Sequence, residues 1–419
     1  MVGGSARGSS ERVDQLVVRR SNLGLVLRTL RDSGPRSRAR LADETGLNKA
    51  TVSSLVAELI DRGLVAEGGV DRAGAVGRPG VVVELDGRRV YGIGVEVNVD
   101  YVALIALDLR GTVVTERRVA MDVPRLGSSR VLDEIVTVLG DSLAELTGGG
   151  ATLAGITVAI PGLIAARSGR VSFAPNLGWR DIPVVDELWR RLGNPPYAIR
   201  LGNDANLSAI GEWAFGPAAG TANLVYLTGE VGVGGGVMSD GRLLAGWAGY
   251  SGEVGHMPLQ PDGDLCGCGR RGCWETVVGL AALLRGVADE DDPVRDPSLD
   301  LEQRLAEISR RAAAKDERTL AALDQIGRGL GIGASILANI FNPEVIVLGG
   351  YFATMGPYVI ERMMAELRAR VVAPDIGGCR VEFSRLGFTA AVRGGAHLAL
   401  EAVLSDPTCV TPAMQEEPA

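Results

Sequence analysis

Apolar residues recur at helical spacing through the first part of the chain, between residues 21 and 60. In SNLGLVLRTL (21–30) the apolar positions follow an i, i+3, i+4, i+7 pattern, and Ser21 before them is a suitable helix N-cap. SRARLADETG (37–46) predicts a short helix from Ser37 that stops near Gly46. A third helix is predicted in LNKATVSSLVAELIDRG (47–63), capped by Asn48 and ended by Gly63. The apolar stripes of the first and third helices consist of Leu23, Val26, Leu27 and Leu30, and of Val52, Leu55, Val56, Leu59 and Ile60.

Three short helices with a tight turn between the second and third predict a helix-turn-helix. Several polar residues near the start of the third helix lie off its apolar stripe, namely Asn48, Lys49, Thr51, Ser53 and Ser54. That end of a recognition helix meets base edges in the major groove, and small polar side chains with a Lys suit such contacts. The alternative is a three-helix packing module with a polar face.

The segment LVAEGGVDRAGAVGRPGVVVEL (64–85) predicts two strands around a Gly-rich tip, which would form a wing. Arg78 in GRPG can enter a narrow minor groove, where negative potential is focused. An ordinary hairpin loop is the alternative, above all for Arg72. Residues 19–86 are therefore predicted to be a winged helix-turn-helix that binds double-stranded DNA, and residues 1–18 to be disordered.

From about residue 90 the pattern changes to strands. YGIGVEVNV (91–99), YVALIALDL (101–109) and TVVTERRVAM (112–121) are β-rich, and a helix (128–146) and a strand (154–160) follow. NLVYLTGEVGVGGGVMSDGRLL (223–244) repeats the strand–turn–strand theme, which suggests a duplicated α/β fold with a ligand cleft between its halves. The segment 390–404 predicts a helix in which His397 is structural, and residues 406–419 are expected to be a disordered tail.

Composition narrows the class of protein. Glycine makes up 58 of 419 residues, about twice typical usage, which favours tight turns and close backbone approaches. The N-terminus has no apolar core typical of a signal peptide, and no apolar run reaches the roughly 18 residues of a membrane span. Residues 1–85 hold 13 Lys and Arg against 10 Asp and Glu in a chain of net charge −8, which hints at nucleic acid for the front only. We therefore expect a cytoplasmic protein with reduced thiols and no membrane partner.

Three of the five cysteines and one of the two histidines fall within HMPLQPDGDLCGCGRRGCWE (256–275). His256, Cys266, Cys268 and Cys273 have the spacing H-x9-C-x-C-x4-C, and a structural Zn²⁺ prefers four such nitrogen and sulfur ligands. Glycines at 267, 269 and 272 let the backbone wrap around one ion. A redox-active disulfide is the rival interpretation, but cysteines two residues apart form a strained disulfide.

GEVGHMPL followed by CGCGRRGCWE resembles the ROK family of repressors, open reading frames and sugar kinases. PNLGW (175–179), LGNDAN (201–206), GEWAFG (211–216) and VIVLGG (345–350) support the resemblance, which covers about residues 88–405. It implies an actin-like, ribonuclease H-like ATPase fold behind the winged helix-turn-helix, with residues 87–405 as a sugar-binding domain. Its two lobes would be residues 87–202 with the C-terminal helix 389–404, and residues 203–388.

The resemblance also implies a monosaccharide pocket lined by polar side chains. The matching positions are Asn203, Asp204, Glu253, His256 and Glu275, with Asn176 as a further candidate. Carboxylates accept hydrogen bonds from sugar hydroxyls, and Asn both donates and accepts. If His256 binds zinc through one ring nitrogen, the other can face the sugar. The alternatives are that Asn203 or Asp204 caps a helix and that Glu253 is a surface acid.

Asp204 also matches the catalytic base of family kinases, but the phosphate loop argues against ATP. Those kinases carry an Asp-x-Gly-Gly-Thr turn, where this chain has GVEVN (94–98) and so lacks the acid and the glycines. Glu96 and Glu230 would repel phosphate. We therefore expect no ATP cofactor and no enzyme activity, but a sugar-responsive repressor that acts as a homo-oligomer, a dimer or tetramer. The alternatives are a bifunctional sugar kinase that uses Asp204 as base and a zinc-responsive switch.

Overall fold

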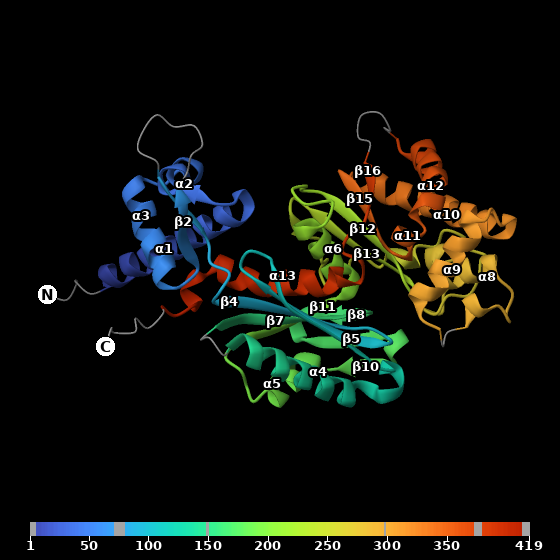
Figure 1. Cartoon of the computed structure of the whole chain (residues 1–419), viewed down its shortest axis with the longest axis horizontal. Helices are drawn as coiled ribbons and strands as arrows, with labels where there is room; N and C mark the ends of the chain where they lie inside the picture. Colours follow the sequence, from blue (N-terminus) through green and yellow to red (C-terminus); the bar gives the residue numbers. More distant parts are fainter. Residues whose placement is uncertain (1–5, 71–79, 148–150, 297–298, 373–378, 413–419) are drawn as a thin grey trace.

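The computed structural model describes residues 6–70, 80–147, 151–296, 299–372 and 379–412. A small N-terminal domain sits beside two larger lobes, and the red helix α13 (Ala390–Ser405) runs from the first lobe to the small domain (Figure 1). Arg72 and Arg78, at the predicted tip of the wing, lie outside the described residues. Within these ranges, no helix combines the length and the apolar character that a membrane span requires.

The N-terminal domain is the winged helix-turn-helix that the apolar pattern predicts. Its elements are α1 (Ala6–Ser33), β1 (Arg36–Ser37), α2 (Arg38–Thr45), α3 (Lys49–Asp61), β2 (Val65–Val70) and β3 (Val81–Leu85), with strand order β1-β3-β2. The apolar stripes of α1 and α3 are buried against each other, with Leu23, Leu27 and Val52 fully inaccessible to solvent. Asn48 caps α3 by accepting a hydrogen bond from the backbone N–H of Thr51.

Three predictions about the two ends of the chain are wrong. Helix α1 begins at Ala6, so Ser21 lies inside the helix rather than at its N-cap, and residues 6–18 are helical rather than disordered. No proline interrupts residues 6–33, so the helix extends upstream of its buried turns. The predicted tail is ordered as far as residue 412, because Asp406 caps the turn η6 (Pro407–Cys409) and Val410 is 1% exposed in the core of the N-terminal domain. The remainder of that tail lies outside the described residues.

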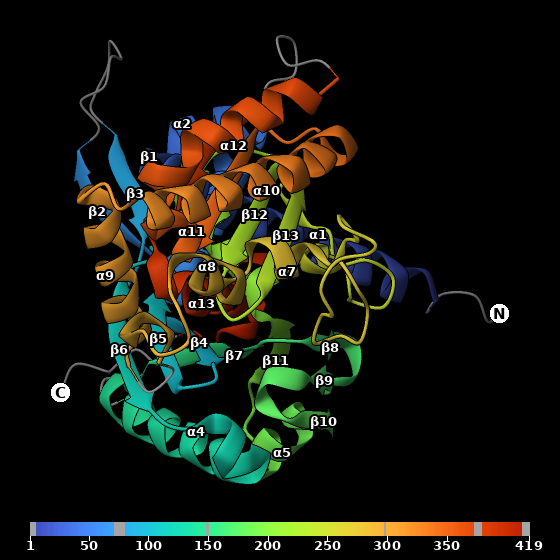
Figure 2. The same cartoon turned by 90° about the vertical axis from the view of Figure 1, so that its right-hand side faces the viewer.

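The first lobe is built on a five-stranded sheet of order β11-β7-β4-β5-β6. Its strands are β4 (Val90–Val97), β5 (Tyr101–Asp108), β6 (Val113–Ala120), β7 (Thr152–Ile160) and β11 (Ala198–Asn203). Helices α4 (Val123–Thr147) and α5 (Val184–Arg191) cover its outer face (Figure 2). A small sheet lies beside it, formed by β8 (Leu163–Ala165), β9 (Arg170–Ala174) and β10 (Trp179–Ile182), with the turns η1 (Ala166–Ser168) and η2 (Pro175–Leu177).

The second lobe repeats this topology, with strand order β14-β13-β12-β15-β16. Its strands are β12 (Leu224–Gly229), β13 (Val233–Ser239), β14 (Arg242–Leu243), β15 (Val345–Gly350) and β16 (Arg380–Phe383). In both sheets an antiparallel meander of three strands continues into two parallel strands, which confirms the predicted duplication. The lobe also contains η3 (Val254–His256), α7 (Trp274–Val278), α8 (Leu280–Val287), η4 (Pro293–Arg295), α9 (Leu301–Ala313), α10 (Glu317–Phe341), α11 (Tyr351–Thr354) and α12 (Gly356–Arg370).

Two helices lie where the sheets of the two lobes meet. Helix α6 (Asp204–Phe215) follows β11 of the first lobe directly and packs on β12 and β13 of the second. Helix α13, preceded by η5 (Gly387–Thr389), packs on α6 and on β4, β5 and β7. The N-terminus of α6 therefore opens between the lobes, where ligands bind in two-lobed proteins.

Candidate functional site

Four side chains with nitrogen or sulfur donors converge in the second lobe, as their spacing predicts. The ligand atoms of His256, Cys266, Cys268 and Cys273 all lie within 4.8 Å of one another. Cys268 Sγ is 3.6 Å from Cys273 Sγ, and Cys266 Sγ is 3.6 Å from His256 Nδ1. The three thiols are free rather than bridged, and the group could hold a metal ion.

The backbone of the cysteine loop folds back on itself in the way that the glycines predict. Gly269 and Gly272 have φ values of +84° and +71°, a conformation that residues with a Cβ rarely adopt. A Cβ on Gly272 would lie 1.5 Å from the carbonyl oxygen of Gln260, so no larger residue fits there. Cys273 then leads directly into α7, whose Trp274 is fully buried and donates its indole N–H to the Gly329 carbonyl. The cluster is therefore anchored to the core of the second lobe.

His256 has two different neighbours on its two ring nitrogens. Nδ1 faces the thiols, whereas Nε2 lies 3.7 Å from Glu253 Oε2. The Glu275 carboxylate approaches the same group, 3.7 Å from His256 Nδ1 and 2.7 Å from Cys266 Sγ. One ring nitrogen thus faces the thiols and the other faces a carboxylate, although 3.7 Å is longer than a hydrogen bond. Glu253 and Glu275 are thus held beside the cysteine cluster.

Asn203 and Asp204 lie at the N-terminus of α6. The Asn203 side chain caps the helix by accepting from the backbone N–H of Asn206, and its amide donates to the Gly162 carbonyl at 3.1 Å. The helix-cap interpretation of Asn203 is therefore correct, although the cap leaves one of its amide hydrogens free for a ligand. Burial raises the pKa of Asp204 to about 6; the hydrogen bond from the Ala205 backbone opposes this increase and the Glu253 carboxylate adds to it.

Glu253 is half-buried, and burial raises the pKa of its carboxyl group while His256 opposes the increase. It is therefore not a freely solvated surface acid. Asn176 lies in η2 of the first lobe, where it is exposed. The hydroxyl groups of Ser172 on the preceding strand β9 and of Tyr250, just upstream of Glu253, are 3.1 Å apart. The strand before Asn176 and the loop before Glu253 thus meet between the lobes.

A series of hydrogen bonds between polar side chains connects the two lobes, and the sequence did not predict it. Tyr101 donates its hydroxyl to Glu96 Oε1 at 3.1 Å, and Asn98 donates its amide to Glu230 Oε2 at 3.2 Å. The Asn98 amide is also 3.2 Å from the Tyr101 hydroxyl. Glu96 and Asn98 belong to the β4–β5 region of the first lobe, whereas Glu230 follows β12 of the second. In the sequence, the one sign of these hydrogen bonds was the presence of Glu96 and Glu230 in the two turns that are compared with the phosphate-binding turns of the family kinases.

Neighbouring carboxyl groups raise the pKa values of Glu96 and Glu230. Burial, followed by the charges of Glu230 and Asp204, raises the pKa of Glu96 well above its usual range, and Glu96 Oε2 has no hydrogen-bond partner among the described residues. Burial and the Asp204 charge raise the pKa of Glu230 to about 7. Both groups therefore keep their protons to higher pH than ordinary glutamates do, and ionising them beside a bound phosphate would be still less favourable.

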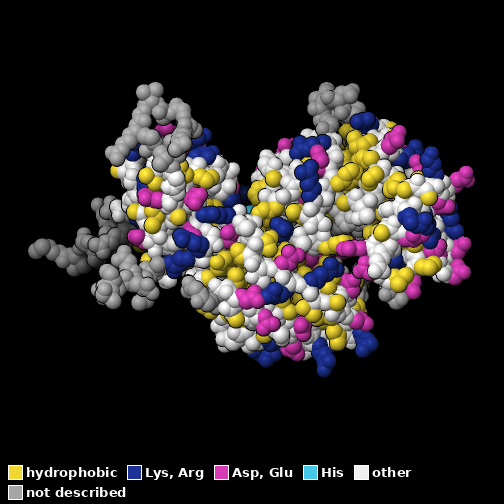
Figure 3. Space-filling model, viewed as in Figure 1, with side chains coloured by type: hydrophobic (Ala, Val, Ile, Leu, Met, Phe, Trp, Pro, Cys, Tyr) yellow, Lys and Arg dark blue, Asp and Glu magenta, His cyan; other side chains and the backbone are white. Residues whose placement is uncertain are grey.

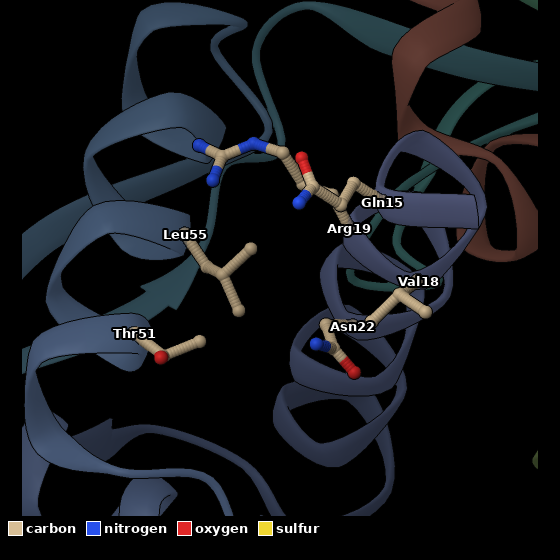
Figure 4. Close-up of a pocket in the computed structure, with 6 residues that line it drawn as sticks. All are labelled: Gln15, Val18, Arg19, Asn22, Thr51 and Leu55. Carbon is tan, nitrogen blue, oxygen red and sulfur yellow. The ribbon is translucent and has the colours of Figure 1, made fainter. Parts of the chain in front are cut away.

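The predicted DNA-contact residues differ in what they contact. Lys49 is exposed at the start of α3, whereas Ser53 donates its hydroxyl to the Lys49 carbonyl. Arg19 of α1 reaches over α3 and bonds Glu58 and Ser54. A groove between α1 and α3 is lined by Gln15, Val18, Arg19, Asn22, Thr51 and Leu55 (Figure 4). Ser54 is thus held by α1, and Lys49 is the one cation in the predicted set that the structure describes.

Comparison with known proteins agrees with the two-part architecture. Residues 92–402 match the model of the ROK family, and residues 24–74 match that of the MarR family. The xylose repressor of Bacillus subtilis is 32% identical over 390 residues, which cover 93% of this chain and 97% of that protein. A glucokinase of Halalkalibacterium halodurans is 29% identical over 313 residues, or 73% of this chain and 94% of the kinase.

Among solved structures, the chain resembles a ROK family transcriptional regulator described as a homolog of the E. coli MLC protein. The TM-score is 0.76 at 26% sequence identity, and the match covers 93% of this chain and 97% of that one. The regulators thus match both the N-terminal domain and the two lobes, whereas the glucokinase match covers a smaller part of the chain.

Proposed function

The chain belongs to the ROK family and carries a MarR-type winged helix in front of its ROK domain, and on this premise we propose that it is a sugar-responsive repressor of carbohydrate genes. The observation that carries the proposal is the end-to-end similarity to a xylose repressor, which spans the DNA-binding domain and both lobes. D-xylose is accordingly the first effector to test.

The effector would bind between the lobes, beside the N-terminus of α6. Its proposed contacts are Asn203, Asp204, Glu253, His256 and Glu275, with Asn176 from the first lobe. The mutual proximity of Glu253, His256 and Glu275 supports this assignment, as does the interaction of Glu253 with Asp204. Carboxylates and amides of this kind recognise sugar hydroxyls by paired hydrogen bonds.

We propose that the metal of the His–Cys cluster is a structural zinc ion, held by His256, Cys266, Cys268 and Cys273. Three thiols and one imidazole within 4.8 Å fit the tetrahedral Cys₃His set that zinc prefers. Bound zinc would supply a fixed point for the loop between Glu253 and Glu275. The protein's own contribution is to hold His256 between the thiols and Glu253, so that the sugar-facing carboxylates keep their positions.

Operator recognition is proposed for the N-terminal end of α3, through Asn48, Lys49, Thr51, Ser53 and Ser54, with Arg78 from the wing. A homo-oligomer with two such domains would read half-sites about one helical turn apart, or a multiple of it. Light scattering of the free protein and the footprint on its operator would measure the oligomeric state and the half-site spacing together.

A bifunctional sugar kinase is the second candidate, and one observation favours it. Asp204 has a pKa raised to about 6, which suits a general base. Against this, Glu96 and Glu230 occupy the turns that would hold the phosphates, and ATP is not expected to bind.

An electrophoretic mobility shift with DNA from upstream of the protein's own gene tests the regulator proposal. We expect a retarded complex whose affinity changes with D-xylose or another monosaccharide and weakens steeply with salt. The absence of retardation on this DNA and on operators selected from a random library would contradict the proposal.

A further inference from the structure

Helix α13 touches α6, the helix that carries Asp204, at the level of the backbone. A Cβ on Gly394 of α13 would lie 1.8 Å from the Leu207 carbonyl oxygen, and a Cβ on Gly211 of α6 would lie 2.3 Å from that of Ala390. Glycine at both positions is therefore required by the crossing itself. Because α6 packs on β12 and β13 of the second lobe and α13 on the sheet of the first, a rotation of one lobe against the other is expected to change this crossing.

The same helix is fixed to the first lobe. Two glycines of β4 face it, and a Cβ on Gly92 or Gly94 would lie 2.5 Å from the Ala396 carbonyl oxygen or 1.9 Å from that of Val392. Gly94 is the position where family kinases carry an acid, and here its lack of a side chain admits α13. Helix α13 and the first-lobe sheet therefore form one packed unit.

The C-terminal half of α13 is equally close to the DNA-binding domain. A Cβ on Gly24 of α1 would lie 2.8 Å from the Leu404 carbonyl oxygen, which also accepts a hydrogen bond from Arg28 at 3.1 Å. Arg31 of α1 forms an ion pair with Glu401. A single hydrophobic core spans this junction and includes Leu23, Val26, Leu27 and Leu30 of α1 with Val392, Ala396, Leu400, Val403 and Leu404 of α13. Figure 3 shows basic and acidic side chains close together where the two parts meet.

Two further hydrogen bonds hold the DNA-binding domain to other parts of the chain. Arg62, at the end of α3, donates to the Val410 carbonyl at 2.6 Å, which holds the C-terminal segment against the domain. Arg110, in the β5–β6 turn of the first lobe, donates to the Leu85 carbonyl of β3 at 2.7 Å. The Arg110 contact thus holds the end of β3 on the first lobe, directly before the segment that leads into β4.

His397 connects the α6 side of the helix with the α1 side. Its ring lies edge-on to Trp213 and Phe215 near the C-terminus of α6, at centroid distances of 6.0 and 5.5 Å. Its Nε2 is 3.5 Å from the Glu401 carboxylate that pairs with Arg31. Residues on adjacent turns of α13 therefore contact α6 on one side and α1 on the other.

We propose that α13 positions the DNA-binding domain rigidly on the first lobe, so that sugar-driven rotation at the α6–α13 crossing reorients the winged helices relative to the second lobe. The proposal rests on the proposed sugar-responsive function and adds the element that couples sugar to DNA. Glu401 and Gly24 are positioning residues in it, because they touch neither the proposed sugar site nor DNA. Loosening their contacts uncouples the two events without removing either binding site.

Two variants with matched controls test this in the full-length protein. Glu401→Gln removes the charge that pairs with Arg31, and Glu145→Gln removes the charge of a more exposed pair with Arg117 within the first lobe. Gly24→Ala inserts a methyl group against the Leu404 carbonyl, whereas Gly140→Ala places one in open space on helix α4. Fluorescence anisotropy gives the operator dissociation constant without sugar and at saturating D-xylose, and melting temperatures report folding.

The measured quantity is the ratio of the two dissociation constants, which saturation makes independent of sugar affinity. We expect Glu401→Gln and Gly24→Ala to move this ratio toward unity by about fivefold or more, with both controls at the wild-type ratio. The inference would be overturned if both test variants kept the wild-type ratio, or if the control variants moved toward unity as far as the test variants. If the wild-type protein binds both sugar and operator but has the same operator dissociation constant with and without sugar, the proposed function is wrong, and the inference fails with it.

Discussion

The Asn98 side-chain amide donates a hydrogen bond of 3.2 Å to Glu230 and so connects the β4–β5 turn of the first lobe to the β12–β13 turn of the second. By resemblance to the family kinases, these are the turns between which a nucleotide would place its phosphates. Here the turns bond to each other, and the buried carboxyl group of Glu96 lies beside them. In this protein the two turns are thus connected by the side chains of Asn98 and Glu230, in the place where a kinase would bind the phosphates of its nucleotide.

The first expected outcome concerns catalysis. In a coupled ADP-release assay with D-xylose, D-glucose and N-acetylglucosamine, the wild-type protein is expected to give no release above the no-sugar background. The physical reason is that the two turns are bonded to each other through Asn98 and Glu230, and that any charge on Glu96 or Glu230 would oppose phosphate binding. Asp204→Asn serves as the control and should give the same background. Sugar-dependent turnover that disappears in this variant would favour the kinase.

A second outcome concerns stability against pH. The folded-state pKa values of Asp204 (about 6) and Glu230 (about 7) lie above their ordinary values of 3.8 and 4.5, so the folded protein binds more protons between about pH 4 and 7. The contribution of these two groups to the free energy of unfolding should therefore fall as the pH rises through this window, whereas His397, whose pKa burial lowers to about 4, contributes in the opposite direction. Glu230→Gln should stabilise the protein by about 1–3 kcal/mol at about pH 8 and less at about pH 5.

Urea unfolding of the wild type and the variant across this pH range would measure the effect. Glu145→Gln, which alters an exposed acid of the first lobe, is the matched control and should leave the slope unchanged. Parallel pH profiles for Glu230→Gln and the wild type would show that Glu230 does not titrate in this window.

The third outcome concerns the cysteine cluster. Cys268→Ser is expected to lower the zinc content below one ion per chain and to weaken D-xylose binding by about tenfold or more, because the loop that carries Glu253 and Glu275 loses its fixed point. Elemental analysis and calorimetry measure the two quantities. Cys379→Ser, outside the cluster, should change neither. Zinc loss that leaves sugar affinity intact but alters operator binding would support the zinc-responsive switch instead.

The fourth outcome concerns DNA. Lys49→Gln should weaken operator binding and reduce the slope of log affinity against log salt by about 1, because it removes one positive charge from the proposed protein–DNA interface. Lys315→Gln, in the turn after α9, makes the same chemical change far from the winged helix and should have no effect. Anisotropy titrations at several salt concentrations give both values. An unchanged slope for Lys49→Gln would remove this residue from the interface.

Local patterns in the sequence identified much of the fold. The apolar stripe with Leu23, Leu27 and Val52 is buried because helical periodicity alone puts those side chains on one face. The cysteine cluster was predictable because its ligands lie close in sequence and its glycines permit the tight turns. The start of α1 was mispredicted because Ser21 has the chemistry of a cap, although the helix simply continues through it.

The ordered C-terminal segment was also missed, for a different reason. Val410 is buried against residues more than 300 positions upstream, and a short polar segment gives no local sign of such a contact. The Asn98–Glu230 bond and the Arg31–Glu401 pair are of the same kind. The roles proposed for the sugar-binding and DNA-binding residues stay predictions that the experiments above address.

The sequence by itself determined the winged helix-turn-helix, the duplicated strand pattern, the His–Cys cluster and the likeness to the ROK family, because each depends mainly on residues that are near neighbours along the chain. Only the tertiary structure decided how these parts are connected: which carboxyls share the space between the lobes, which nitrogen of His256 faces the thiols, and how α13 joins the lobe to the DNA-binding domain. Those relationships depend on packing between segments that are far apart in sequence, and local propensity carries no information about that packing.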